Sequence, residues 1–151
     1  MPASAEPVSG IAIRRVGLSD TALLDRIAPH VFDEPIHPER LCAYLSEPGH
    51  LLVLALEADL VVGQCAAVIH HHSDKPMELY VDEVGTASTH LRQGIATAML
   101  ADIFSWGREL GCTEAWLGTE LYNDAANALY RTFKPVEDEA IRYFLFDLSR
   151  A

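Results

Sequence analysis

Glu83 is the residue whose type and position best suit proton transfer. It ends an apolar stretch that predicts a strand, and there Leu79, Val81 and Glu83 would share one face because alternate strand residues point the same way. Partial burial of a carboxylate raises its pKa and suits it to take a proton from an ammonium group. A capped or salt-bridged glutamate at a strand end is the alternative. Glu78 and Asp82 would lie on the opposite face, where either could contact a cation.

A second candidate site is the turn Arg92–Ala96, between this strand and a long predicted helix. Gly94 lets the backbone approach a ligand closely and adopt a positive φ. The first N–H groups of the helix have no intrahelical partner, so the turn favours a phosphate or pyrophosphate. A tight turn that uses glycine only for its geometry is the alternative. The residues that this hypothesis assigns to phosphate binding are Arg92, Gln93, Gly94, Ile95, Ala96 and Thr97.

Two stretches together resemble the GCN5-related N-acetyltransferase (GNAT) superfamily. Leu91–Ala96 is similar to its motif [R/Q]-x-x-G-x-[G/A], with matches at Gly94 and Ala96 and a leucine where the family has Arg or Gln. Asn123–Tyr130 is similar to the motif N-x-x-A-x-x-[F/L]-Y, with matches at Asn123, Ala126, Leu129 and Tyr130. The resemblance covers residues 11–148. It implies a mixed α/β fold with a twisted sheet of six to seven strands and about four helices.

The resemblance also implies acetyl-CoA as co-substrate and direct acetyl transfer in a ternary complex. Backbone N–H groups of Val84, Gly85 and Thr86 would hold the pantetheine, and Asn123, Ala126 and Tyr130 would contact the rest of the co-substrate. Glu83 would take the proton from the amine, directly or through water. Tyr130 would protonate the leaving thiolate, since a phenol O–H can act as a general acid. The alternative is that Asn123 only caps a helix and Tyr130 only packs.

A finer resemblance concerns residues 31–35, 78–84 and 92–98. They look like the branch that acetylates aminoglycosides, notably the 3-N-acetyltransferases of the gentamicin type, which confer resistance. The resemblance implies a cationic substrate bound by acidic side chains, here Asp33, Glu34, Glu78, Asp82, Glu83 and Glu120. Two alternatives stay open: another amine acceptor such as a polyamine, small metabolite or peptide, and a non-catalytic acyl-CoA sensor.

Composition limits the partners. The 151 residues carry a net charge of −11, which repels nucleic acid and anionic membranes and favours cations. The cysteines Cys42, Cys65 and Cys112 form no disulfide or metal spacing, and residues 1–10 read as a flexible tail without signal-peptide features. We therefore expect a cytoplasmic single domain over 11–151, with pairing of sheet edges into a homodimer as a possibility.

The run His70–His72 invites a metal interpretation. Consecutive residues on an extended chain point to alternate sides and make a poor ligand set, so we predict no metal site.

The elements that would position these residues follow from hydrophobic periodicity. The sequence predicts strands at 11–16, 51–56, 60–69, 77–86, 114–119 and 141–148, with a further, less certain strand before the last. It predicts helices at 20–28, 38–46, 94–110 and 124–132. This order implies a mixed sheet with helices on its faces.

Overall fold

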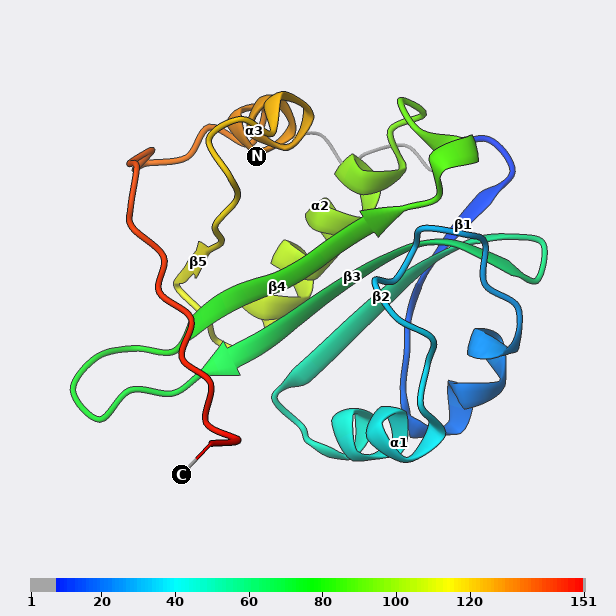
Figure 1. Ribbon diagram of the computed structural model, residues 1–151, viewed down its shortest axis with the longest axis horizontal. Helices are drawn as coiled ribbons and strands as arrows, with labels where there is room; N and C mark the ends of the chain where they lie inside the picture. The colour runs from blue at the N-terminus through cyan, green and yellow to red at the C-terminus, as the bar shows by residue number, and fades with distance from the viewer. Residues whose placement is uncertain (1–7, 151) are drawn as a thin grey trace. The chain divides into compact units, whose positions relative to one another are not determined.

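The computed structural model describes residues 8–150 and confirms the mixed α/β architecture (Figure 1). One strand and two helices come first, three consecutive strands follow, and two helices, a short strand and a last helix complete the described chain. In chain order the elements are β1 Ile11–Arg15, the 3₁₀ helix η1 Leu18–Asp25, α1 Pro38–Ser46, β2 His50–Glu57, β3 Leu60–His70, β4 Glu78–Thr86, the 3₁₀ helix η2 Ser88–His90, α2 Ile95–Glu109, β5 Glu114–Trp116 and α3 Asp124–Arg131.

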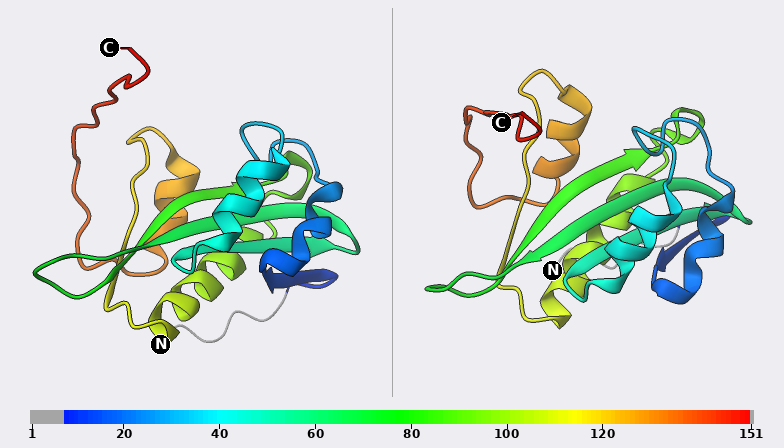
Figure 2. Two further views of the ribbon diagram at one scale, coloured as in Figure 1. Left: turned by 90° about the horizontal axis from the view of Figure 1, so that it is seen from below. Right: turned by 60° about the horizontal axis from the view of Figure 1, so that its bottom comes forward.

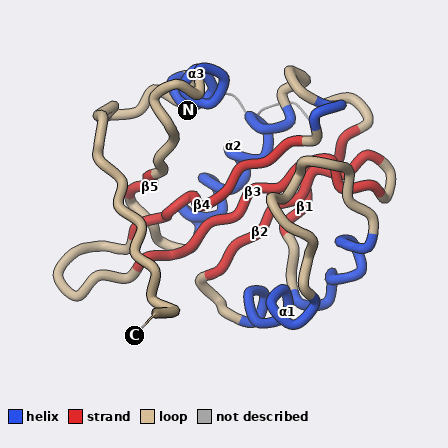
Figure 3. The backbone as a smooth tube through the Cα atoms, in the orientation of Figure 1, coloured by secondary structure: helices blue, strands red, loops and turns tan. Residues whose placement is uncertain are grey.

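The strands form one five-stranded sheet in the order β1-β2-β3-β4-β5 (Figure 3). The first four strands pair antiparallel, and β5 pairs parallel to β4. Strands β2 and β3 are buried on both faces over most of their length, which explains their continuous aliphatic composition. The turn between them, with Ala58 at φ 53°, connects the two strands as a hairpin.

Different elements cover the two faces of the sheet. Helix α2 lies along one face, where its Gly107 packs on Leu79 of β4 and its Met99 on Gly63 of β3. The segment 26–37, which joins η1 to α1, lies on the opposite face (Figures 1 and 2). The core of the sheet is therefore closed from both sides.

Arg15 ties the first strand to α2. Its guanidinium donates two hydrogen bonds to Asp102, at 3.2 and 3.1 Å, and two to Glu109, at 2.7 and 3.1 Å. It also lies 5.2 Å from the ring centre of Trp106. These two carboxylates raise the pKa of Arg15 above its usual value. Such a bidentate, charge-assisted contact fixes geometry better than a single exposed ion pair.

Several element predictions are wrong in detail. The segment 20–28 forms the 3₁₀ helix η1 rather than an α-helix and ends at Asp25. Strand β5 has three residues, shorter than the predicted 114–119. The structure assigns no strand to residues 133–150, so the described residues contain five strands rather than six to seven. An extended segment forms a β-strand only when its backbone hydrogen-bonds to that of a second extended segment. Residues 119–150 contain no strand.

The chain divides into two compact units, Met1–Gly118 and Thr119–Ala151. The first contains the whole sheet with α1 and α2, and the second contains α3. The predicted tail falls mostly on residues 1–7, outside the described residues. Cys65 and Cys112 are buried free thiols, whereas Cys42 is exposed. No helix within 8–150 is long and apolar enough to cross a bilayer.

Candidate active site

A β-bulge at Asp82 decides where Glu83 points. Ala66 pairs with Glu83, but its neighbour Ala67 pairs with Val81, so Asp82 is an extra residue in β4. Because Ala66 and Ala67 point to opposite faces of β3, Glu83 and Val81 also do. The prediction that Glu83 shares the apolar face of Leu79 and Val81 is therefore wrong. The bulge turns Glu83 away from α2, onto the face that segment 26–37 covers.

The same correction applies to Glu78. It pairs with His70, and this register places it on the face of Glu83 rather than on the opposite one. It lies at the other end of β4, where the ring of His72 contacts its carboxylate at 3.0 Å. Five positions along β4 thus separate Glu78 from Glu83.

Gln64 holds the carboxylate of Glu83. Its side-chain Nε2 donates to Glu83 Oε2 at 3.2 Å and lies 3.4 Å from the carbonyl oxygen of Val31. Gln64 is 2% exposed and is the only buried polar side chain among the described residues. Its Oε1 atom has no hydrogen-bond partner there. Gln64 is not among the residues predicted for the site, although a lone glutamine in the aliphatic run of β3 is a signal of a buried polar contact.

The environment of Glu83 favours its protonated form. Partial desolvation raises its pKa, and the negative charges of Asp82 and Asp33 raise it further, while the hydrogen bond from Gln64 acts in the opposite direction. The charges of Asp82 and Glu83 also add to the burial that raises the pKa of Tyr44 in α1. A carboxylate with a raised pKa is a stronger base than an ordinary one, which suits it to accept a proton.

Segment 26–37 approaches β4 closely beside Glu83. A Cβ on Gly85 would lie only 2.2 Å from the carbonyl oxygen of Val31, so no other residue fits there without displacing the segment. Val31 is buried, whereas Asp33 and Glu34 are exposed two and three residues later. The structure therefore brings Asp33 to the same end of β4 as Asp82 and Glu83, and Glu34 follows on the exposed segment.

Helix α2 begins with an open N-terminus. Gly94 adopts φ 78°, a left-handed conformation that favours glycine, and the first helical hydrogen bond runs from Ala98 N to Gly94 O at 3.0 Å. The N–H groups of Ile95, Ala96 and Thr97 precede that bond, and no side chain of the described residues caps them. This arrangement fits a pyrophosphate. The same turn contains the exposed side chains of Leu91, Arg92 and Gln93.

The edge of β4 next to β5 is open beyond Tyr80. Strand β5 pairs only with Glu78–Tyr80, although β4 continues to Thr86. Every second backbone N–H and C=O pair in Val84, Gly85 and Thr86 points to this edge. No strand in the described part of the chain pairs with them there. An extended ligand with amide groups can pair with such an edge, as peptides do in strand addition.

The second unit holds the remaining predicted residues. Asn123 is the N-cap of α3, where its Oδ1 accepts a hydrogen bond from Ala126 N at 3.1 Å. The alternative that Asn123 caps a helix is thus correct for its Oδ1 atom. Tyr130 lies within α3, and the carbonyl of Glu120 accepts a hydrogen bond from the Asn127 side chain at 3.0 Å. The unit presents these residues around one short helix.

Comparisons with known proteins bear on this arrangement. Residues 21–134 match the acetyltransferase (GNAT) family. No curated protein matches the sequence. Among solved structures, the chain is similar to the aminoglycoside acetyltransferase meta-AAC0020 from an uncultured soil metagenomic sample, in complex with sisomicin. The TM-score is 0.81 at 19% identity, over 93% of this chain and 97% of that one.

Two further structures are similar over almost the whole chain. One is AAC(6')-Iy in complex with the bisubstrate analogue CoA-S-monomethyl-acetylneamine, with TM-score 0.72 and 16% identity over 91% of this chain and 98% of that one. The other is a transcriptional regulator from Bacillus halodurans C-125, with TM-score 0.71 and 16% identity over 89% and 99%. At these identities the likeness establishes the fold.

Proposed function

Because this chain belongs to the acetyltransferase (GNAT) family, we propose that it acetylates an amino group of an aminoglycoside. The family assignment makes it an N-acetyltransferase with acetyl-CoA as co-substrate. The open N-terminus of α2 and the unpaired edge of β4 fit the phosphates and the amide-containing arm of that molecule. When bound, the co-substrate supplies the acetyl group.

The observation that carries the substrate proposal is the acidic end of β4. Glu83 is held by Gln64, and the charges of Asp82 and Asp33 lie near enough to raise its pKa. An aminoglycoside is a polycation, so clustered carboxylates both attract it and orient it. The similar soil metagenomic and AAC(6') acetyltransferases, which are named for aminoglycosides, support this choice. Glu34 and Glu120 are further candidates for contacts with substrate amines, whereas Glu78 lies at the other end of β4 from Glu83.

We assign the proton-transfer roles as follows. Glu83 takes a proton from the substrate ammonium, directly or through a water molecule, and its raised pKa suits this step. Backbone N–H groups of Val84–Thr86 polarise the thioester carbonyl. Tyr130 gives a proton to the leaving thiolate. Arg92, Gln93 and the turn up to Thr97 bind the pyrophosphate, and Asn123 with Ala126 contributes from α3.

The test is release of thiol from acetyl-CoA with gentamicin, kanamycin, apramycin, spermidine and a short peptide as acceptors. We expect turnover with at least one aminoglycoside. The position of the acetyl group in the product then distinguishes 3-N from 6'-N transfer. Turnover with spermidine or peptide alone would contradict the substrate proposal and leave the enzyme class intact. CoA binding with no turnover of any acceptor would instead indicate a sensor.

Variants test the roles of the acidic residues. We expect Glu83→Gln to lower kcat by about 10² to 10⁴-fold, which is the usual contribution of a general base. Asp33→Asn should raise the KM for the aminoglycoside and leave that for acetyl-CoA unchanged. The matched control is Asp74→Asn, an exposed acidic residue in the loop at the other end of β4. A Glu83→Gln enzyme at wild-type rate would exclude this role for Glu83.

The proposal includes resistance to aminoglycosides and a homodimer. Resistance is tested by expressing the protein in a susceptible bacterium and measuring the drug concentration that inhibits growth, with Glu83→Gln as the inactive control. Light scattering at several protein concentrations measures the second, and a constant monomer mass would contradict it.

A further inference from the structure

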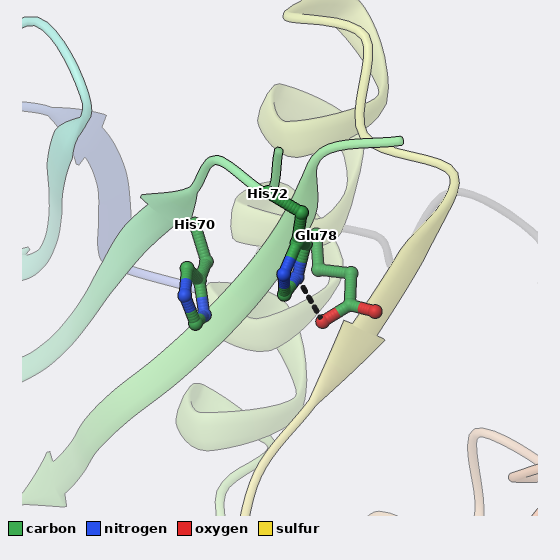
Figure 4. A group of neighbouring side chains, drawn as sticks. All are labelled: His70, His72 and Glu78. Carbon is green, nitrogen blue, oxygen red and sulfur yellow. Dashed lines mark hydrogen bonds and ion pairs between the residues drawn. The ribbon is translucent and has the colours of Figure 1, made fainter. Parts of the chain in front are cut away.

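Three side chains with metal-binding atoms meet where β3 ends and β4 begins (Figure 4). His70 is the last residue of β3, Glu78 is the first of β4, and the two are register partners. His72 lies in the loop between them. One ligand atom from each residue falls within 4.8 Å of the others. Figure 4 shows the two imidazoles side by side, with the ring of His72 directed at the carboxylate of Glu78.

The contacts within this cluster are ordered. His72 Nε2 lies 3.0 Å from Glu78 Oε2, and the rings of His70 and His72 stack with centres 4.3 Å apart. The side chains of His72 and Glu78 are only 16% and 17% exposed. Two of the three donors are therefore held in place before any ion binds, which reduces the entropy that binding would cost.

The expectation of no metal site considered three consecutive histidines. In the structure His71 is exposed and does not belong to the cluster. His70 and His72 are alternate residues and lie on one side, and the third donor comes from across the hairpin. Alternation of side chains along an extended chain therefore does not separate these three donors.

We propose that His70, His72 and Glu78 bind a divalent transition-metal ion of the zinc class. Two imidazoles and one carboxylate form a common zinc ligand set, with water completing the coordination. Metal–ligand bonds of about 2.0 to 2.2 Å place tetrahedral donors about 3.3 to 3.6 Å apart. The three donor atoms, now within 4.8 Å, reach that spacing by side-chain rotation. Hard cations such as Mg²⁺ prefer oxygen ligands and fit this set poorly.

Neighbouring charges modify the site in both directions. Glu114 of β5 is the register partner of Glu78 on its other side, and its carboxylate adds negative charge. Lys75 in the loop acts on Glu78 with the opposite sign. Because the site lies at the other end of β4 from Glu83, we assign the ion a structural role, linking the two ends of the loop.

The test uses the full chain without a histidine tag, freed of metal by a chelator and then dialysed. Zinc chloride is titrated by calorimetry, and Co²⁺ is followed by its visible absorption, which reports coordination geometry. We expect one ion per chain with a Kd of about 10 μM or lower. Zinc at about 100 times the Kd should raise Tm by about 5 to 10 °C, because binding to the folded state stabilises it.

Three variants identify the ligands. His72→Ala and Glu78→Gln should each weaken zinc binding by about tenfold or more. His71→Ala, which removes a neighbouring imidazole outside the cluster, should change the Kd less than twofold. Glu78→Gln keeps the side-chain shape, so it serves as the second measurement if His72→Ala does not fold. A Kd weaker than about 100 μM, or equal losses in His71→Ala and Glu78→Gln, would overturn the proposal.

Discussion

Replacing Gly85 with alanine should damage both stability and catalysis, because this position lets segment 26–37 reach β4. An added Cβ would lie 2.2 Å from the Val31 carbonyl oxygen, and ordinary contact begins at 3.4 Å. The carbonyl must therefore recede by about 1.2 Å. Val31 is 2% exposed, so surrounding side chains oppose that movement.

The expected magnitude combines three effects. Overpacking of this kind costs about 1 to 3 kcal/mol. Weakening the Gln64–Val31 hydrogen bond, already long at 3.4 Å, adds about 0.5 kcal/mol. The lower entropy of the unfolded alanine chain offsets about 0.4 to 1 kcal/mol. The clash dominates, and the middle of these ranges gives an expected net loss of about 2 kcal/mol, or about 4 to 8 °C in Tm.

The effect on catalysis follows from the same displacement. Gln64 contacts both Val31 and Glu83, so movement of the segment disturbs the carboxylate as well as Asp33. A misplacement of about 1 Å can cost about 100-fold in rate, and we expect kcat/KM to fall by about 10 to 100-fold.

Urea unfolding and steady-state kinetics measure the two effects of Gly85→Ala. Gly49→Ala is the matched control, because its added Cβ would meet only ordinary contacts, the nearest at 3.4 Å from Ile69. If Gly85→Ala stays within about 0.5 kcal/mol of wild type, and its kcat/KM within twofold, the close approach of the segment is not what positions this site.

The remaining predictions concern pH, the Arg15 contact and the co-substrate turn. Glu83 must be ionised to act as a base, and its pKa is raised, so kcat/KM should rise with pH through that pKa. The hydrogen bond from Gln64 lowers the pKa of Glu83. Gln64→Leu removes this bond and should therefore move the rise in kcat/KM to higher pH. The raised folded-state pKa also means that stability due to Glu83 is present at low pH and is lost as pH rises through that pKa, so Glu83→Gln should flatten the pH dependence of urea unfolding. Arg15→Met should cost about 1 to 2 kcal/mol in the same assay, whereas Arg14→Met, which breaks one exposed pair, should cost less than about 0.5 kcal/mol. Leu91→Gln should lower the KM for acetyl-CoA by about two- to tenfold through an added donor, and an unchanged KM would show that the backbone alone binds the phosphates.

Sequence periodicity predicts most of the first unit because its strands and helices have strong, local patterns. The hairpin β2–β3 and the helix α2 agree with the structure to within a residue or two. The orientation of Glu83 could not be predicted in this way. Strict alternation assumes one residue per partner, and the extra residue at Asp82 becomes visible only in the pairing of β3 with β4.

Other features depend on contacts between distant residues. The largely apolar composition of residues 141–148 predicts a strand, but pairing is a property of two segments and the composition describes one. Gln64 lies in β3 and Glu83 in β4, so the sequence around either residue alone does not predict the contact between them. The cluster of His70, His72 and Glu78 required the register of the β3–β4 hairpin.

The contact of Arg15 with α2 has a consequence for the order in which the protein folds during synthesis. Arg15 is 87 residues from Asp102 and 94 from Glu109. Although β1 leaves the ribosome first, its guanidinium finds its partners only after the last turn of α2 has emerged. At about 5 to 20 residues per second, that delay lasts about 5 to 20 s. During this time Arg15 has neither Asp102 nor Glu109 as a partner, so the contact between β1 and α2 is completed only after α2 has been synthesised.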